Sequence, residues 1–116
     1  MRKRSSTSVR IFYPKFDKEG LIKLLSERLG ELAARLPLVR VILFGSYVKG
    51  NYTAGSDVDL LIVHKGRPRD DAYAMVKKIL NIPRLEPHVY TEEEYRRMEE
   101  TLTKMTKDGI TLFPLN

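Results

Sequence analysis

Two short motifs, joined by residues 47–56, constrain the fold of this chain more than any other feature. Gly45-Ser46 follows the apolar run 41–44, and Asp57-Val58-Asp59 precedes the apolar run 60–63. An apolar run of this kind, rich in β-branched residues, predicts a strand buried on both faces. The chain must therefore turn sharply at the end of one buried strand and bring two carboxylates to the start of the next.

Length and composition favour one small domain without a membrane anchor. The chain has 116 residues, of which 42% are hydrophobic, and no apolar run approaches the ~18 residues that a membrane helix needs. The opening Met-Arg-Lys-Arg is not followed by an apolar stretch, so no secretory signal is expected. The absence of cysteine excludes disulfides and thiolate metal sites, and it fits an intracellular, cytoplasmic location.

The positive charge is concentrated at the N-terminus. The formal net charge is +6, and residues 1–16 carry five of the 21 basic side chains and no acid, which leaves 16 bases against 15 acids in the remainder. We expect residues 1–10 to form a flexible basic tail ahead of a domain over residues 11–116. Such a tail could contact nucleic acid, but a solvated basic end is the favoured interpretation.

Hydrophobic periodicity predicts a mixed α/β (α+β) domain with one small sheet covered by helices. The expected helices cover residues 17–36, 46–49, 70–80 and a continuous stretch after Thr91, and the expected strands cover 38–44, 57–64, 85–90 and 110–113. Residues 11–13 could add an edge strand or lie over the first helix. The methionines at helical spacing are expected in the core, and His64 at the surface or an interface.

Local signals sharpen three of these elements. Asp17 has the character of a helix N-cap. Thr91 followed by Glu94 matches a capping box, which also explains the acidic run 92–94 without metal binding. Pro87 cannot donate a backbone hydrogen bond, so the strand 85–90 is expected at an edge of the sheet.

Gly45 and Ser46 have the character of a phosphate-binding turn. Glycine lets the backbone approach a ligand closely, and the free N–H groups at a helix start favour an anion. Taken alone, a motif this short more commonly marks an ordinary strand-to-helix turn. A Walker loop is excluded, because Asn51-Tyr52 follow Gly50 where Lys and Ser or Thr would be required.

Asp57 and Asp59 indicate a metal site. Two carboxylates on one face of a strand can bind one or two hard cations through oxygen, and a metal pair can hold the attacking and leaving oxygens of a phosphoryl displacement. A polar strand face in water is the alternative. Because the strand continues into the buried run 60–63, two uncompensated acids would be costly here, and metal binding is favoured.

Together the motifs resemble those of the polymerase-β-like nucleotidyltransferase superfamily, in which Gly-Ser and an acid-hydrophobic-acid-hydrophobic run lie between two strands. Gly45-Ser46, Gly50 and Ser56-Asp57-Val58-Asp59-Leu60 match the fuller form of its small members, the minimal nucleotidyltransferases. The flanking elements agree over roughly residues 17–113. The resemblance implies a nucleotidyltransferase fold built on a small mixed sheet.

This resemblance implies roles for the motif residues. Gly45 and Ser46 would bind the β- and γ-phosphates of ATP, while Asp57 and Asp59 would act as catalytic ligands of two Mg²⁺ ions. Lys49 occupies a position where small members commonly carry Arg. It could touch phosphate, and a solvated surface lysine is an equal alternative.

The family usually has a third carboxylate on the next long strand, acting on the attacking hydroxyl. Glu86 is the candidate for this catalytic residue and third metal ligand, since it is expected to share a strand face with His88 and Tyr90. The sequence departs from the family here, because Asp is more usual and no proline normally adjoins it. His88 is the substitute as a base.

The resemblance also implies a function and a partner. Small members are typically paired with a helical HEPN-type ribonuclease toxin and act as its antitoxin by transferring AMP from ATP to a tyrosine of the toxin. No segment is left over here to hold the acceptor, so a partner or a second copy of the chain is expected to complete the site. A non-catalytic antitoxin and a nucleotidyltransferase acting on RNA or a small molecule remain open alternatives.

Overall fold

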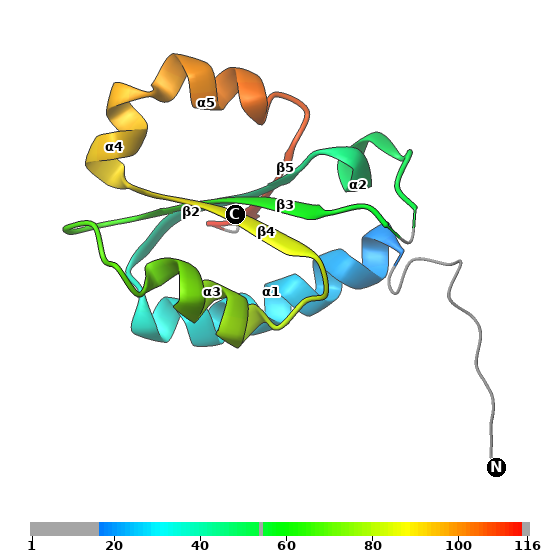
Figure 1. Cartoon of the computed structure of the whole chain (residues 1–116), viewed down its shortest axis with the longest axis horizontal. Helices are drawn as coiled ribbons and strands as arrows, with labels where there is room; N and C mark the ends of the chain where they lie inside the picture. Colours follow the sequence, from blue (N-terminus) through cyan, green and yellow to red (C-terminus); the bar gives the residue numbers. More distant parts are fainter. Residues whose placement is uncertain (1–16, 54, 115–116) are drawn as a thin grey trace, which may run out of the picture.

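The computed structural model describes residues 17–53 and 55–114, which form a four-stranded mixed sheet with helices on both faces (Figure 1). The helices are α1 (Lys18–Arg35), α2 (Ser46–Lys49), α3 (Ala72–Leu80), α4 (Glu92–Arg97) and α5 (Glu99–Met105). The strands are β2 (Leu38–Phe44), β3 (Val58–His64), β4 (Leu85–Thr91) and β5 (Ile110–Phe113). The predicted fold class is confirmed, while the expected tail 1–10 and strand 11–13 lie outside the described residues.

The strand that begins with the aspartate motif lies inside the sheet. The strand order is β4-β3-β2-β5, with β3 antiparallel to β2 and parallel to β4. In this register Asp59 lies opposite Phe44 of β2 on one side and Glu86 of β4 on the other. β4 lies at an edge, as Pro87 predicts.

Alternation along β3 sorts its side chains between two cores. Val58, Leu60 and Ile62 belong to the larger core, which α1 and α3 cover. Leu61 and Val63 belong to a smaller cluster completed by residues of α4 and α5. Figure 1 shows these helix pairs on opposite faces of the sheet. By the same alternation, Asp59 lies on the sheet face that α4 and α5 cover. It lies opposite Phe44, which is the last residue of the smaller cluster at this end of the strand.

Both predicted caps are present. The Asp17 side chain accepts a hydrogen bond of 2.7 Å from the Gly20 N–H at the start of α1. At the start of α4 the Thr91 hydroxyl accepts from the Glu94 N–H, and the Glu94 carboxylate accepts from the Thr91 N–H at 2.8 Å. No helix in the described part of the chain is long and apolar enough to cross a membrane.

The expected continuous helix after Thr91 is wrong, because the structure breaks it at Met98. The Met98 N–H is shared between the carbonyls of Glu94 and Tyr95 at 3.1 Å, and α5 starts anew at the next residue. The break removes Met98 and Met105 from a common buried stripe. Their side chains are 40% and 37% exposed, so the expectation that the methionines are core fails for these two.

His64 is buried, and the prediction of a surface or interface position is wrong. The residue is 1% exposed at the end of β3, and its Nδ1 lies 2.9 Å from the Lys65 carbonyl oxygen. A polar ring tolerates burial when one of its nitrogens has such a partner. The sequence places His64 at a strand end but gives no sign that other elements cover this end.

The turn between α5 and β5 is pressed against β2 at Gly109. The Gly109 N–H donates to the Thr106 carbonyl at 2.8 Å. A Cβ at position 109 would lie 2.5 Å from Ile42 Cγ2 and 2.9 Å from the Leu43 carbonyl oxygen. Since only glycine permits this approach, Gly109 fixes the end of α5 beside the end of β2.

Gly109→Ala therefore destabilises the protein by about 1–3 kcal/mol through overpacking. Gly30→Ala is the matched control, because Gly30 lies inside α1 and its added Cβ would meet nothing within 4 Å. This control is expected to stabilise the protein by about 0.5–1 kcal/mol. Urea unfolding midpoints measure both, and equal midpoints for the two variants would contradict the close approach at Gly109.

Candidate active site

Gly45 shapes the junction between β2 and α2. Its backbone has φ +86° and ψ −153°, a conformation essentially limited to glycine. A Cβ at this position would lie 2.5 Å from Asp59 Oδ2 and 3.3 Å from Asp59 Cγ. The missing side chain thus allows the turn before Ser46 to lie directly against the Asp59 carboxylate.

Two stacked tyrosines pack next to this turn. Tyr47 of α2 is buried, and its ring stacks on Tyr52 with 4.3 Å between centroids and 7° between planes. Burial, and secondarily the neighbouring Tyr52, raise the pKa of Tyr47. The Tyr52 hydroxyl accepts from the Lys18 N–H at 3.3 Å, which ties the loop after α2 to the start of α1.

Asp59 of β3 lies between side chains of the two neighbouring strands, β2 and β4. Its Oδ1 is 3.5 Å from His88 Nε2 on β4, and the His88 ring packs on Phe44 of β2 with centroids 5.3 Å apart. The Asp59 side chain is 27% exposed. Asp59 is therefore the more enclosed of the two predicted metal ligands, and it retains access to solvent.

Asp57 precedes β3 and pairs with a residue that sequence reasoning missed. The Asp57 Oδ1 lies 3.1 Å from Arg84 Nη2, with both side chains about half exposed. The Arg84 carbonyl accepts from the Val58 N–H at 2.9 Å, so the backbone holds Arg84 beside Asp57. No motif marks Arg84, because its contact follows from the parallel pairing of β3 and β4. An ion pair this exposed contributes little stability and can yield to a competing cation.

Glu86 lies beside Asp59 in the sheet register, but its side chain has another partner. The Tyr73 hydroxyl of α3 donates to Glu86 Oε1 at 3.4 Å, and both residues are exposed. Across residues 17–53 and 55–114, no three His, Cys, Asp or Glu side chains come together in a group that could hold a metal ion. The fold brings Glu86 next to the aspartates without gathering the three into a cluster, and its role as third ligand stays a prediction.

The two aspartates have the donor chemistry of a hard divalent cation. Mg²⁺ is usually bound through one or two carboxylates, with substrate phosphates and water completing its coordination. Asp57 and Asp59 supply such a pair at the solvent-accessible start of β3, next to the Gly45 turn. The residues therefore fit a metal that binds together with a phosphate-bearing substrate and needs no third protein ligand.

A cavity of about 330 Å³ opens beside the same turn. Gly45, Val48 and Lys49 line it from the β2–α2 side, and Lys104 and Lys107 line it from the end of α5 and the turn that follows. Sequence reasoning singled out Lys49 and missed the other two lysines. No local motif could have found them, because the approach of Gly109 to β2 brings them beside Gly45.

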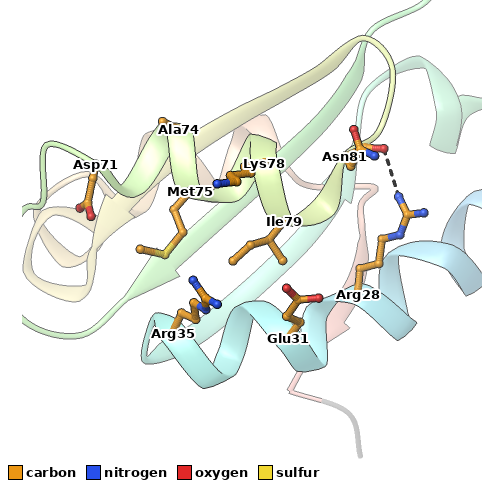
Figure 2. A pocket seen from close by; sticks show the side chains of 9 residues that line it. All are labelled: Arg28, Glu31, Arg35, Asp71, Ala74, Met75, Lys78, Ile79 and Asn81. Atoms are coloured by element: carbon orange, nitrogen blue, oxygen red, sulfur yellow. Dashed lines mark hydrogen bonds between the residues drawn. The ribbon is translucent and has the colours of Figure 1, made fainter.

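A larger cavity of about 600 Å³ lies away from these residues, between α1 and α3 (Figure 2). Arg28 at this cavity donates to the carbonyls of Leu80 and Asn81 at 2.6 and 3.0 Å, which satisfies the C-terminal end of α3. The other charged residues that line it carry both signs: Glu31, Arg35, Asp71 and Lys78. None of the predicted site residues lines this cavity, so its size does not locate the site.

Comparisons with known proteins identify the family of the fold. The sequence model of a family described as nucleotidyltransferase domain matches residues 22–111, which contain both motifs. A crystal structure from Sulfolobus solfataricus, described as that of a candidate nucleotidyltransferase, has a TM-score of 0.54 to this structure and 26% sequence identity. The match covers 82% of this chain and 81% of that chain. No curated protein matches the sequence.

Gly45 and Gly50 provide a matched pair of variants for the contact with Asp59. Both have φ near +85°, but a Cβ at Gly50 would meet nothing within 4 Å. Gly50→Ala is expected to cost about 1–2 kcal/mol of backbone strain. Gly45→Ala carries its own backbone strain and also displaces the Asp59 carboxylate, so we expect a larger loss of stability and weaker binding of Mn²⁺.

Urea unfolding and calorimetric titration with Mn²⁺ measure the two effects. If Gly45→Ala lost no more stability and no more Mn²⁺ affinity than Gly50→Ala, the contact between the turn and Asp59 would have no functional consequence.

Proposed function

The chain belongs to the nucleotidyltransferase domain family, and we propose that it transfers a nucleoside monophosphate, AMP from ATP, to a hydroxyl group. One observation carries this proposal. The Gly45 turn, suited to phosphate, lies directly against Asp59, whose neighbour Asp57 completes a pair of carboxylates suited to metal. A phosphate and its counter-cation would thus be bound side by side.

Nucleotidyltransferase domains use a nucleoside triphosphate and a divalent metal. In the proposed reaction the acceptor oxygen forms a bond to the α-phosphorus, and the bond from that phosphorus to the leaving pyrophosphate breaks. Asp57 and Asp59 would hold Mg²⁺, as two ions, while Gly45 and Ser46 bind the β- and γ-phosphates. The bound metal supplies charge neutralisation of the phosphates and of the pyrophosphate that leaves.

Glu86 is the proposed acceptor of the proton from the attacking hydroxyl. It lies next to Asp59 on the edge strand β4, and its own side chain is exposed, so an acceptor from solvent can approach. The Tyr73 hydroxyl would orient the Glu86 carboxylate through their hydrogen bond. His88, on the same strand face, is the substitute base, although its Nε2 already lies near Asp59.

We propose that the acceptor is a tyrosine of a helical HEPN-type toxin, which makes the chain its antitoxin. Two features support this. The motifs resemble those of small nucleotidyltransferases paired with such toxins. In addition, the smaller cluster ends at Phe44 on the sheet face that bears Asp59, so α4 and α5 do not cover the site. Asp57 and Glu86 are exposed at this end of the sheet. A docked partner, or a second copy of the chain, would supply the missing wall of the site.

A second candidate function is neutralisation of the partner by contact alone. One observation favours it: each aspartate already has a basic neighbour, Arg84 or His88. Modification of RNA or a small molecule, with residues 1–16 as a basic arm, depends on residues outside the described range.

Labelling of the purified partner with radioactive ATP and Mg²⁺ separates the two candidates. Asp57→Asn combined with Asp59→Asn is expected to lower the labelling rate at least about 100-fold, since the metal contributes several kcal/mol to transition-state stabilisation. Asp70→Asn with Asp71→Asn is the control of equal charge, because both carboxylates are exposed and neither belongs to the site. Labelling that survives in the first double variant would exclude the mechanism.

The same variants decide whether transfer matters for neutralisation. Toxin activity is measured with the wild type and with the Asp57→Asn, Asp59→Asn double variant at equal concentrations. The enzymatic function predicts that the double variant fails to neutralise while still folding with an unchanged unfolding midpoint. Full neutralisation by the double variant would instead establish the contact-only function.

Glu86→Gln tests the proposed base. We expect kcat to fall about 100-fold or more, with a small change in the KM for ATP, because general-base catalysis typically contributes 10²–10⁴-fold. Tyr73→Phe removes only the orienting hydroxyl and is expected to lower kcat less than about tenfold. An unchanged kcat for Glu86→Gln together with a large loss for His88→Gln would transfer the role to His88.

A further inference from the structure

We propose that Lys104 and Lys107 join Lys49 in a subsite that binds the β- and γ-phosphates of the triphosphate and retains them as pyrophosphate after transfer. This inference rests on the proposed function and adds residues that lie outside both sequence motifs. Their place is the cavity of about 330 Å³ beside Gly45, where α2 meets the end of α5.

The position of the cavity matches the path of a triphosphate. Gly45 lines the cavity on one side and contacts the Asp59 carboxylate on the other. An α-phosphate near the two aspartates would therefore place the following phosphates at the Gly45 turn and into this cavity. Its volume is close to the lower limit of the ~300–1,000 Å³ typical of ligand pockets, so it suits part of a nucleotide better than the whole.

The second side of the cavity is held in place by the close approach of Gly109. The Gly109 position leaves no room for a Cβ between Ile42 and Leu43, so the turn cannot move toward β2. The buried Thr106 hydroxyl donates to the Leu102 carbonyl at 2.8 Å, which ties the same turn to α5. Lys104 and Lys107 lie on either side of Thr106, so these contacts hold their backbone in place.

The charges at the cavity are suited to a polyanion. Three lysines line it against one carboxylate, that of Asp108. Within the described part of the chain, none of the three lysines forms an ion pair or a side-chain hydrogen bond, and all three are exposed. Their ammonium groups remain available to a ligand, whereas the carboxylates of the motif have basic neighbours.

Lysine chemistry favours phosphate over the nucleoside at this place. The ammonium group is a compact charge with three donors, which phosphate oxygens accept well. A base would instead need an aromatic face to stack on, and the aromatic residue at this cavity, Phe44, is itself only 9% exposed. The base and ribose are thus expected outside this cavity.

Inorganic tripolyphosphate tests the subsite without a nucleoside and without metal. Calorimetric titration of the full chain is carried out with wild type, with Lys104→Ala combined with Lys107→Ala, and with Lys23→Ala combined with Lys78→Ala. The control removes two exposed lysines of α1 and α3 and so keeps the same net charge. We expect Kd to rise about tenfold or more in the first double variant and less than about twofold in the control.

Steady-state kinetics with ATP provide a second test of the subsite. Because the lysines would bind the phosphates in both ground and transition states, their loss is expected to raise KM more than it lowers kcat. It is also expected to weaken product inhibition by pyrophosphate about tenfold or more. Equal Kd values for the two double variants, or stronger competition by single-stranded oligonucleotide than by tripolyphosphate, would overturn the subsite.

The experiment separates this inference from the proposed function. The Asp57→Asn, Asp59→Asn variant removes two negative charges beside the Gly45 turn, so it is expected to bind tripolyphosphate at least as tightly as the wild type. If lysine-dependent binding of tripolyphosphate is found but no nucleotidyl transfer is detected, the subsite stands and the proposed function fails. If transfer occurs and the Lys104→Ala, Lys107→Ala variant keeps wild-type KM and Kd, the function stands and the subsite fails.

Discussion

The contact between the Gly45 backbone and the Asp59 carboxylate is the constraint on which the site depends. It requires a left-handed φ at the end of β2 and the absence of a Cβ, and glycine meets both conditions. It also requires the antiparallel register that sets Phe44 opposite Asp59. A shift of that register by one residue would turn Asp59 to the face of the larger core, where an unpaired carboxylate is costly.

The same strand supplies both the stability and the chemistry of the fold. Leu60 to Val63 of β3 are buried between two helical layers, and this holds the start of the strand in place. At that start, the alternation of side chains places Val58 in the larger core and Asp59 on the opposite face of the sheet, beyond the smaller cluster. The carboxylates thus lie at the solvent-accessible start of an interior strand, directly next to its buried residues.

Local sequence signals predicted the features that depend on neighbouring residues alone. Asp17 and the pair Thr91 and Glu94 cap helices as their spacing indicates, and Pro87 correctly placed β4 at an edge. Apart from the break of the expected helix at Met98, the failures concern contacts between distant segments. The burial of His64 depends on elements that pack over the end of β3, and Arg84 reaches Asp57 through the parallel pairing of two strands.

The two lysines at the end of α5 were missed for the same reason, since only the close approach of Gly109 to β2 brings them to the site.

A crystal structure with Mn²⁺ and a non-hydrolysable ATP analogue tests the central claim most directly. Anomalous density between Asp57 and Asp59, with the triphosphate along Gly45 and Ser46, is the predicted result. Mn²⁺ bound at Glu92–Glu94 instead, or the analogue bound between α1 and α3, would contradict it.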